Sequence, residues 1–180
     1  MQSGEILTAT LDDGSAIEYV YDANAPRGGM KHTFFTPDRK YAVQFFNDPR
    51  DAHNLQMQDR IRSIVGKYNP TLSEEDGGAI GNTTKTADYF RKRFCWPVAT
   101  IRSPEFGIVC PTYPQNFFFG DGASSLLNLK GKDKKSNWFT GRNRRYIEAA
   151  ELGDFRTMLS TAIGLSRTVR RMHQAGLAHS

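Results

Sequence analysis

The sequence predicts an α+β fold in which a group of strands precedes the main helices. Short β-branched runs separated by tight-turn motifs occupy residues 6–46. Apolar residues then recur at helical spacing over 49–68, and the most regular amphipathic helix runs over 154–174. Alternation with a period of two is typical of strands, whereas spacings of three and four are typical of helices. A chain of 180 residues has room for one domain and part of a second.

Composition excludes several classes of protein. A hydrophobic content of 38% and a charged content of 24% exclude a wholly disordered chain. No apolar run approaches the roughly 20 residues of a membrane-spanning helix, and the polar N-terminus lacks the core of a secretion signal. We therefore expect a cytoplasmic protein. Cys95 and Cys110 lie in apolar runs without metal-ligand spacing, so we expect small buried hydrophobes rather than metal ligands.

Two β-hairpins are expected in the first quarter of the chain. Each combines two strand-like runs with a tight-turn motif: 6–11 and 16–21 around Asp12-Asp13-Gly14-Ser15, and 30–36 and 41–46 around Pro37-Asp38. A helix over 49–68 follows, because Asp48 is a suitable N-cap before a proline at the first helical position. Two more short strands are predicted over 98–101 and 106–109.

The last third of the sequence is predicted to be helical. Helix 154–174 places one set of apolar side chains on a single face: Phe155, Met158, Leu159, Ala162, Ile163, Val169 and Met172. Part of this face has nothing to pack against in so short a chain, which predicts self-association or a covering partner.

Residues 130–145 concentrate Lys and Arg around a single Asp. Cations beside Trp138, Phe139 and Tyr146 could hold phosphates and stack on bases, which would suit a nucleic-acid-binding protein. We favour the other interpretation, a solvated mobile loop between two folded segments.

The final ten residues carry the most specific pattern. Met172-His173 is followed by Gly176, two apolar residues and then His179-Ser180. This order resembles the approach to the catalytic loop of protein kinases, Leu-His-x-x-Gly-apolar-apolar-His-Arg-Asp. It is similar to atypical bacterial protein-kinase-like proteins that have His-Ser-Asp in place of His-Arg-Asp.

The resemblance implies a fold and a division of the chain. Residues 1–113 would form a kinase-like small lobe and hinge, with a five-stranded antiparallel sheet and one αC-type helix. Residues 114–180 would begin the helical large lobe, with a basic loop over 130–145 and the long helix over 154–174. His179 and Ser180 would lead into the catalytic loop. The resemblance places the catalytic Asp and the metal ligands after Ser180, so no catalytic residue is expected in this chain.

The resemblance also implies a nucleotide site. Gly28 and Gly29 stand where the glycine-rich phosphate-covering loop is expected, and Gln44 replaces the usual lysine. Lys31, on the next strand, is the candidate cation for the phosphates; the alternative is an ordinary surface lysine. Asp59 would replace the helical Glu that pairs with that lysine; the alternative is an ion pair with Arg62 on a solvated face.

The resemblance places the hinge at 106–113. Thr112 and Tyr113 are the candidates for contact with adenine, since hinge backbone groups usually bond its edge. The alternative is a proline-stiffened linker. The implied cofactors are ATP and Mg²⁺, and the implied partner is a protein substrate or partner domain.

Three functions follow from these patterns. The first is the ATP-binding portion of an atypical Ser/Thr protein kinase, inactive as these 180 residues alone. The second is a pseudokinase-type interaction module that has abandoned ATP. The third is the basic nucleic-acid-binding protein. Stabilisation by Mg-ATP that depends on Lys31 separates the first from the second, and salt-sensitive retention on nucleic acid identifies the third.

Overall fold

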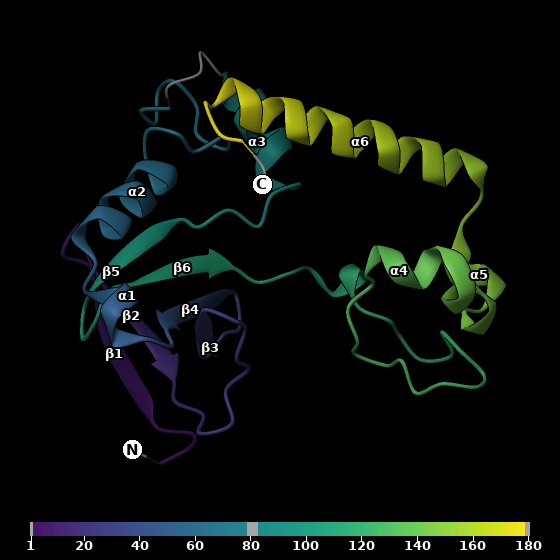
Figure 1. Cartoon of the computed structure of the whole chain (residues 1–180), viewed down its shortest axis with the longest axis horizontal. Coiled ribbons are helices and arrows are strands. Elements are labelled where there is room, and N and C mark those ends of the chain that lie inside the picture. Colours follow the sequence, from purple (N-terminus) through teal and green to yellow (C-terminus); the bar gives the residue numbers. More distant parts are fainter. Residues whose placement is uncertain (1, 79–82, 179–180) are drawn as a thin grey trace. The chain divides into compact units, whose positions relative to one another are not determined.

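The computed structural model describes residues 2–78 and 83–178. It divides into two compact units, residues 1–112 with 168–180 and residues 113–167 (Figure 1). Each unit is described by itself.

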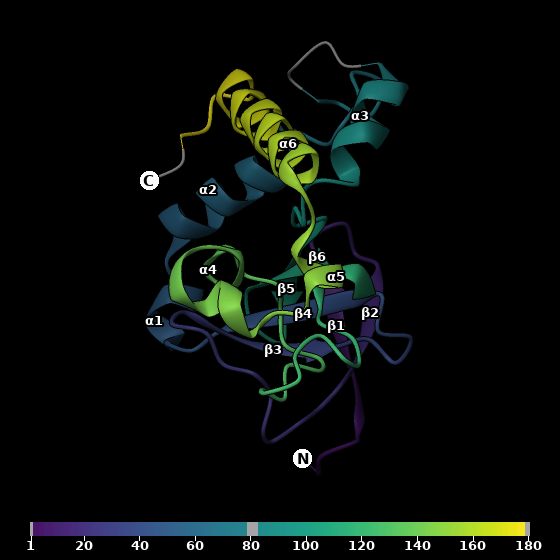
Figure 2. The same cartoon turned by 90° about the vertical axis from the view of Figure 1, so that its right-hand side faces the viewer.

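The first unit is built on a closed antiparallel β-barrel (Figure 1 and Figure 2). Neighbouring strands follow the order β1-β2-β3-β4-β6-β5. The strands are β1 (Ile6–Leu11), β2 (Ala16–Val20), β3 (Lys31–Phe35), β4 (Tyr41–Phe46), β5 (Ala99–Ser103) and β6 (Gly107–Pro111). Both expected hairpins are present, and β5 and β6 form a third.

The predicted kinase-like small lobe with a five-stranded antiparallel sheet is wrong. The sheet has six strands and closes, because β1 pairs with β2 on one side and with β5 on the other. Thr10 lies opposite Ser103, Leu11 lies opposite Ile101, and the register shifts between these two pairs. Such an irregularity bends a strand and increases its twist, which suits closure of a sheet. Alternation in the sequence indicates where strands lie, but it does not indicate which strands pair with one another.

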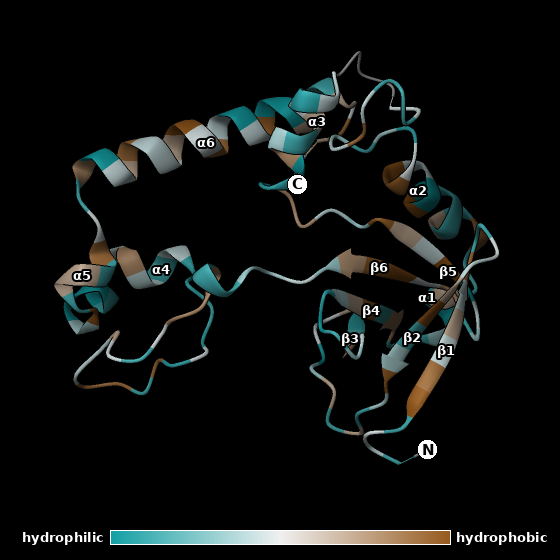
Figure 3. Cartoon of the chain, turned by 180° about the vertical axis from the view of Figure 1, so that it is seen from behind, coloured by the Kyte–Doolittle hydropathy of each residue, from teal (hydrophilic) through white to brown (hydrophobic). Residues whose placement is uncertain are grey.

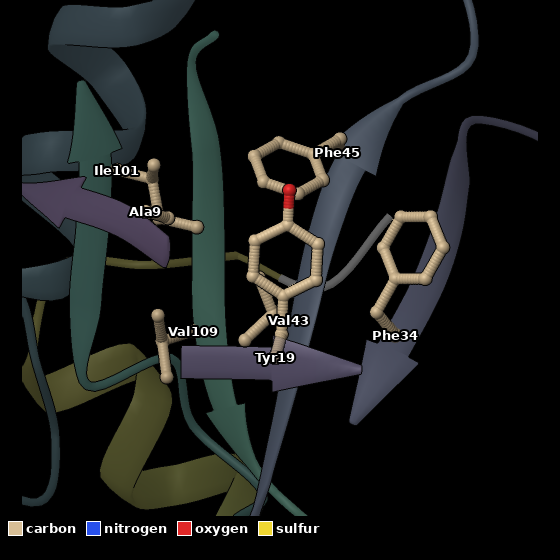
Figure 4. Close-up of a cluster of buried hydrophobic side chains, with 7 residues drawn as sticks. All are labelled: Ala9, Tyr19, Phe34, Val43, Phe45, Ile101 and Val109. Atoms are coloured by element: carbon tan, nitrogen blue, oxygen red, sulfur yellow. The ribbon is translucent and has the colours of Figure 1, made fainter. Parts of the chain in front are cut away.

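The barrel is filled by side chains from all six strands (Figure 4). Tyr19 lies at the centre, with its ring centroid 5.4 Å from that of Phe34 and 5.5 Å from that of Phe45. The cluster comprises Ala9, Tyr19, Phe34, Val43, Phe45, Ile101 and Val109. Gly107 is required beside it, since a Cβ there would lie 2.5 Å from the carbonyl oxygen of Gln44.

The predicted helix over 49–68 is two helices, α1 (Pro49–Ala52) and α2 (Leu55–Val65). The break occurs because Asn54 caps α2, its side chain accepting a 3.1 Å hydrogen bond from the backbone N–H of Met57. Met57 and Ile61 of α2 pack on a second cluster outside the barrel, formed by Phe46, Ala52 and Phe106. A further helix, α3 (Thr84–Arg91), begins at an N-cap threonine.

The second unit has a small core of its own. Its elements are η1 (Gln115–Phe117), α4 (Ser136–Phe139), η2 (Gly141–Tyr146), α5 (Ala149–Leu152) and most of α6 (Phe155–Gln174). The core is formed by Phe119, Ala123, Leu129 and Ile147. Much of the predicted basic loop is therefore helical, in α4 and η2.

Helix α6 confirms the long helix predicted at 154–174. Asp154 caps it, with a carboxylate oxygen 2.7 Å from the backbone nitrogen of Thr157. Apolar and polar residues alternate along the helix (Figure 3). Phe155, Met158 and Ile163 are among its exposed apolar side chains. Among the described residues, no helix combines the length and apolar character required for a membrane span.

Candidate functional site

One face of the β3–β4–β6 sheet carries Lys31 together with Thr33 and Gln44. Residues that lie opposite each other in adjacent strands point to the same face, and alternate residues of a strand share a face. The register pairs Lys31 with Phe46 and Gln44 with both Thr33 and Ile108. This face is the one turned away from the barrel core. We call it the lysine face: Lys31, Thr33, Phe35, Ala42, Gln44, Phe46, Ile108 and Cys110.

Lys31 is the single cation of the lysine face, and it is half-buried. Its Nζ lies 5.1 Å from the centre of the Phe46 ring. Burial lowers the pKa of the Lys31 ammonium, since loss of water disfavours the charged form. Within residues 2–78 and 83–178, no carboxylate forms an ion pair with it. The part of the chain that the structure describes thus leaves this partly desolvated cation without an anionic partner.

The neighbours of Lys31 on this face carry no charge to compete with a ligand. Gln44, which replaces the lysine expected there, donates from Nε2 to the Thr33 hydroxyl oxygen at 3.2 Å. Burial raises the pKa of the Cys110 thiol to about 11, so Cys110 is protonated at neutral pH. Phe46 is buried against α1 and α2 and closes one end of the face.

The Gly28–Gly29 segment lies along β3 next to Lys31. The backbone N–H of Gly28 donates to the Lys31 carbonyl at 2.8 Å, and the N–H of Thr33 donates to the Pro26 carbonyl at 2.9 Å. Asn47 fastens the segment from the end of β4, donating from Nδ2 to the Gly28 carbonyl at 2.9 Å. Neither glycine has a positive φ, and a Cβ at Gly29 would meet nothing within 4 Å. The loop conformation therefore does not require these glycines, which leave open space above the backbone.

Asp59 does not accompany Lys31. It is exposed on α2 and lies 3.3 Å from the guanidinium of Arg62, the alternative arrangement considered for it. Arg62 also binds Asp12 through Nε at 2.7 Å and lies over the ring of Phe106, 5.2 Å from its centre. Asp59 thus belongs to an ion-pair network that joins α2 to the end of β1.

The expected hinge residues lie on either side of the boundary between the two units. The backbone N–H of Thr112 donates to the Lys40 carbonyl at 2.9 Å, which extends the pairing of β4 with β6. Its hydroxyl donates to the Arg39 carbonyl at 2.8 Å. Both donors are therefore used within the protein and do not fit an adenine edge. Tyr113 is exposed and near the rings of Phe117 and Phe118.

The two cysteines are free thiols in partly buried positions. Cys95 donates from Sγ to the Pro111 carbonyl at 2.8 Å, and burial raises its pKa. Among residues 2–78 and 83–178, no group of three His, Cys, Asp or Glu side chains could hold a metal ion. His179 and Ser180 lie outside the described residues.

The aromatic residues in and beside the basic stretch 130–145 are engaged within the second unit. Tyr146 is half-buried, and the Arg145 guanidinium lies 4.7 Å from the centre of its ring. Trp138 and Phe139 pack against Phe119 in the core of the second unit, each with its ring centroid 6.0 Å from that of Phe119. Three of the lysines form ion pairs: Lys130 with Asp121, Lys134 with Glu151 and Lys135 with Asp133. Trp138 and Phe139 are therefore not placed to stack on bases.

Sequence patterns did not identify Asn47, which holds the Gly28–Gly29 segment against the end of β4. It is the first polar residue after the apolar run of β4 and precedes the Asp48 cap, so its position in the chain resembles an ordinary strand end. Only the approach of the Gly28 loop shows its function.

No family model matches this sequence, and no curated protein or solved structure matches it. Function is therefore inferred from the geometry of the lysine face.

Proposed function

We propose that the first unit binds the phosphates of ATP through Lys31, as the ATP-binding portion of an atypical Ser/Thr protein kinase. The observation that supports this is the half-buried Lys31 ammonium, which has no carboxylate partner among the described residues. A partly desolvated charge is costly unless it is paired, and a ligand phosphate supplies the missing anion.

The surroundings of Lys31 leave room for a phosphate and, within the described part of the chain, offer no competing charge. Gln44 and Thr33 are neutral and already bonded to each other. The Gly28–Gly29 segment presents an exposed backbone beside the cation without side chains that would obstruct a ligand. Backbone that can approach closely is a common feature of phosphate-binding loops. Mg²⁺ would arrive with the nucleotide.

The lysine face is proposed to bind ATP but not to catalyse phosphoryl transfer. This face carries no carboxylate, so it has neither a general base for a hydroxyl nor an acidic metal ligand. The alternative, an interaction module without nucleotide, requires that Lys31 contribute nothing to ATP binding.

Calorimetric titration with Mg-ATP tests the proposal. We expect the wild-type chain to bind Mg-ATP and inorganic tripolyphosphate, and adenosine at least tenfold more weakly, because the cation recognises phosphate. Lys31→Met should weaken Mg-ATP binding at least tenfold, about 1.4 kcal/mol. Lys85→Met is the matched control, since Lys85 is exposed on α3, and it should bind as the wild type does.

Two results would overturn the proposal. One is the absence of Mg-ATP binding by the wild-type chain, which favours the interaction module. The other is equal binding by Lys31→Met and Lys85→Met, which places any nucleotide away from the lysine face.

A further inference from the structure

The first unit contains a cavity of about 410 Å³ that the proposed nucleotide site does not use. Its walls come from the end of α2 and the chain after it, from the segment that follows α3, and from the edge of the barrel at β4 and β6. No residue of the lysine face lines it. The volume lies within the range of about 300–1,000 Å³ that is typical of small-molecule pockets.

Aromatic rings dominate one wall of the cavity. Phe94 and Trp96 meet edge to face, with ring centroids 5.5 Å apart and planes at 81°. Tyr41 contributes a third ring from the start of β4, and Val65 and Val98 add aliphatic surface. Offset and edge-to-face contacts are the geometries that aromatic rings prefer, so this wall favours a planar aromatic guest.

The polar groups of the wall are bonded within the protein. The indole N–H of Trp96 donates to the Ile64 carbonyl at 2.9 Å. Asn69 donates from Nδ2 to the Val65 carbonyl at 2.9 Å, and its side-chain oxygen accepts from both the backbone and the hydroxyl of Thr71. A guest would gain little by offering hydrogen bonds to these groups, because they already have partners.

The two cations that line the cavity already have carboxylate partners. Lys40 Nζ lies 3.2 Å from the Asp38 carboxylate. Arg91 binds Asp76 and Asp88, each at 3.0 Å. An anionic guest would have to compete with these carboxylates, and a cationic guest would meet the ammonium and the guanidinium.

We propose that this cavity is a binding site for a neutral, planar aromatic molecule of about two fused rings. The inference goes beyond the proposed function and is independent of it. The aromatic rings of the wall, together with polar groups and cations that already have partners, define the class of ligand.

Ligand-observed NMR and calorimetry with three related probes test this site. The probes are indole, indole-3-carboxylate and tryptamine, which are neutral, anionic and cationic at pH 7. We expect saturable 1:1 binding of indole, at least tenfold tighter than binding of either charged probe. Val98→Phe should weaken indole binding at least tenfold by filling the cavity. Val98 tolerates a larger side chain because it is 50% exposed.

Ile6→Phe provides a matched control, since Ile6 is 55% exposed on β1 and does not line the cavity. It should bind indole within twofold of the wild type. Val65→Phe fills the cavity from α2 and replaces Val98→Phe if that variant does not unfold cooperatively. The inference is overturned if indole does not saturate, if either filled variant binds it as the wild type does, or if a charged probe binds more tightly.

Discussion

Lys31 illustrates how one side chain links the stability of the barrel to ligand binding. Burial lowers its pKa, so the folded chain releases this proton at a lower pH than the unfolded chain does. Stability therefore rises with pH between the lowered pKa and the ordinary value of 10.5. At neutral pH the folded chain carries a partly desolvated ammonium, and that cost is a property of the unliganded state.

Lys31→Met should accordingly raise the stability of the unliganded chain at pH 7 by about 1 kcal/mol, or about 2–4 °C in Tm. Methionine keeps an apolar contact with the Phe46 ring and removes the charge. The gain should shrink as the pH rises from the lowered pKa of Lys31 in the folded chain toward the ordinary value of 10.5. Thermal unfolding at pH 7 and pH 10 measures both values. A variant that is less stable than the wild type at pH 7 would show that the ammonium already has a stabilising partner.

Gly107 tests the packing of the barrel wall. An alanine Cβ at this position would lie 2.5 Å from the Gln44 carbonyl oxygen and 2.9 Å from the Phe45 ring. Gly107→Ala should lower the free energy of unfolding by about 1–3 kcal/mol, because β4 and β6 must separate to admit the methyl group. Gly29→Ala is the control and should be nearly neutral in urea unfolding. Equal stability of the two variants would contradict the register of β4 with β6.

At the scale of single elements, the C-terminal turn of α6 is held by a buried guanidinium. Arg171 is 4% exposed, donates from Nε to the Pro70 carbonyl at 3.2 Å and lies over the Phe90 ring. Its Nη2 is buried without a hydrogen-bond partner among the described residues, and burial lowers its pKa. The side chain therefore contributes packing and one hydrogen bond but bears a desolvation cost.

Arg171→Met should unfold at a Tm equal to or above that of the wild type, since an unpaired buried charge is exchanged for an apolar chain of similar length. Arg171→Ala should lower the free energy of unfolding by about 2 kcal/mol, because the packing over Phe90 is lost as well. Thermal unfolding of the pair separates charge from packing. A Tm for Arg171→Met below that of the wild type would show that Nη2 has an anionic partner in solution.

The sequence predicts self-association or a covering partner for the apolar side chains of α6, and this remains a proposal. Phe155 and Met158 are 72% and 62% exposed, and Leu165 is 62% exposed. Such an apolar surface on one helix favours self-association or a covering partner. Sedimentation at several protein concentrations tests self-association, and a constant monomer mass would exclude it.

At the scale of the whole molecule, closure of the barrel depends on β1. Asp12, just after β1, accepts from the Thr100 hydroxyl at 2.6 Å and from Arg62 Nε at 2.7 Å. Burial alone would raise the pKa of Asp12, but the hydrogen bonds from Arg62 and Thr100 outweigh it and the pKa is lowered. Asp12 therefore joins the closing strand pair to α2.

Asp12→Asn should reduce stability at pH 7 by about 1–2 kcal/mol, since it weakens charge-assisted hydrogen bonds. The folded-state pKa lies below 3.8, so this stabilisation is present above 3.8 and is lost as the pH falls through the lowered value. Urea unfolding at pH 7 and pH 3 should therefore show a difference between variant and wild type that narrows in acid. If the difference in stability does not change with pH, the charge of Asp12 does not contribute to the stability of the folded chain.

Local patterns predicted the strands and the long helix, because alternation, turn residues and caps act over a few neighbouring residues. They did not predict the closed barrel, because the pairing of Leu11 with Ile101 joins segments far apart in the chain. The site divides in the same way. Lys31 was identified from its place after Gly28 and Gly29, whereas the pairing of Asp59 with Arg62 and the use of the Thr112 N–H by β4 depend on tertiary contacts.

The pKa of Lys31 in the presence and absence of Mg-ATP tests the central claim most directly. NMR titration of chain labelled at lysine Nζ should give a value below 10.5 in the free protein, and Mg-ATP should raise it, because a phosphate stabilises the ammonium. A value near 10.5 that does not respond to Mg-ATP would show that Lys31 is an ordinary surface lysine and that the lysine face does not bind phosphates.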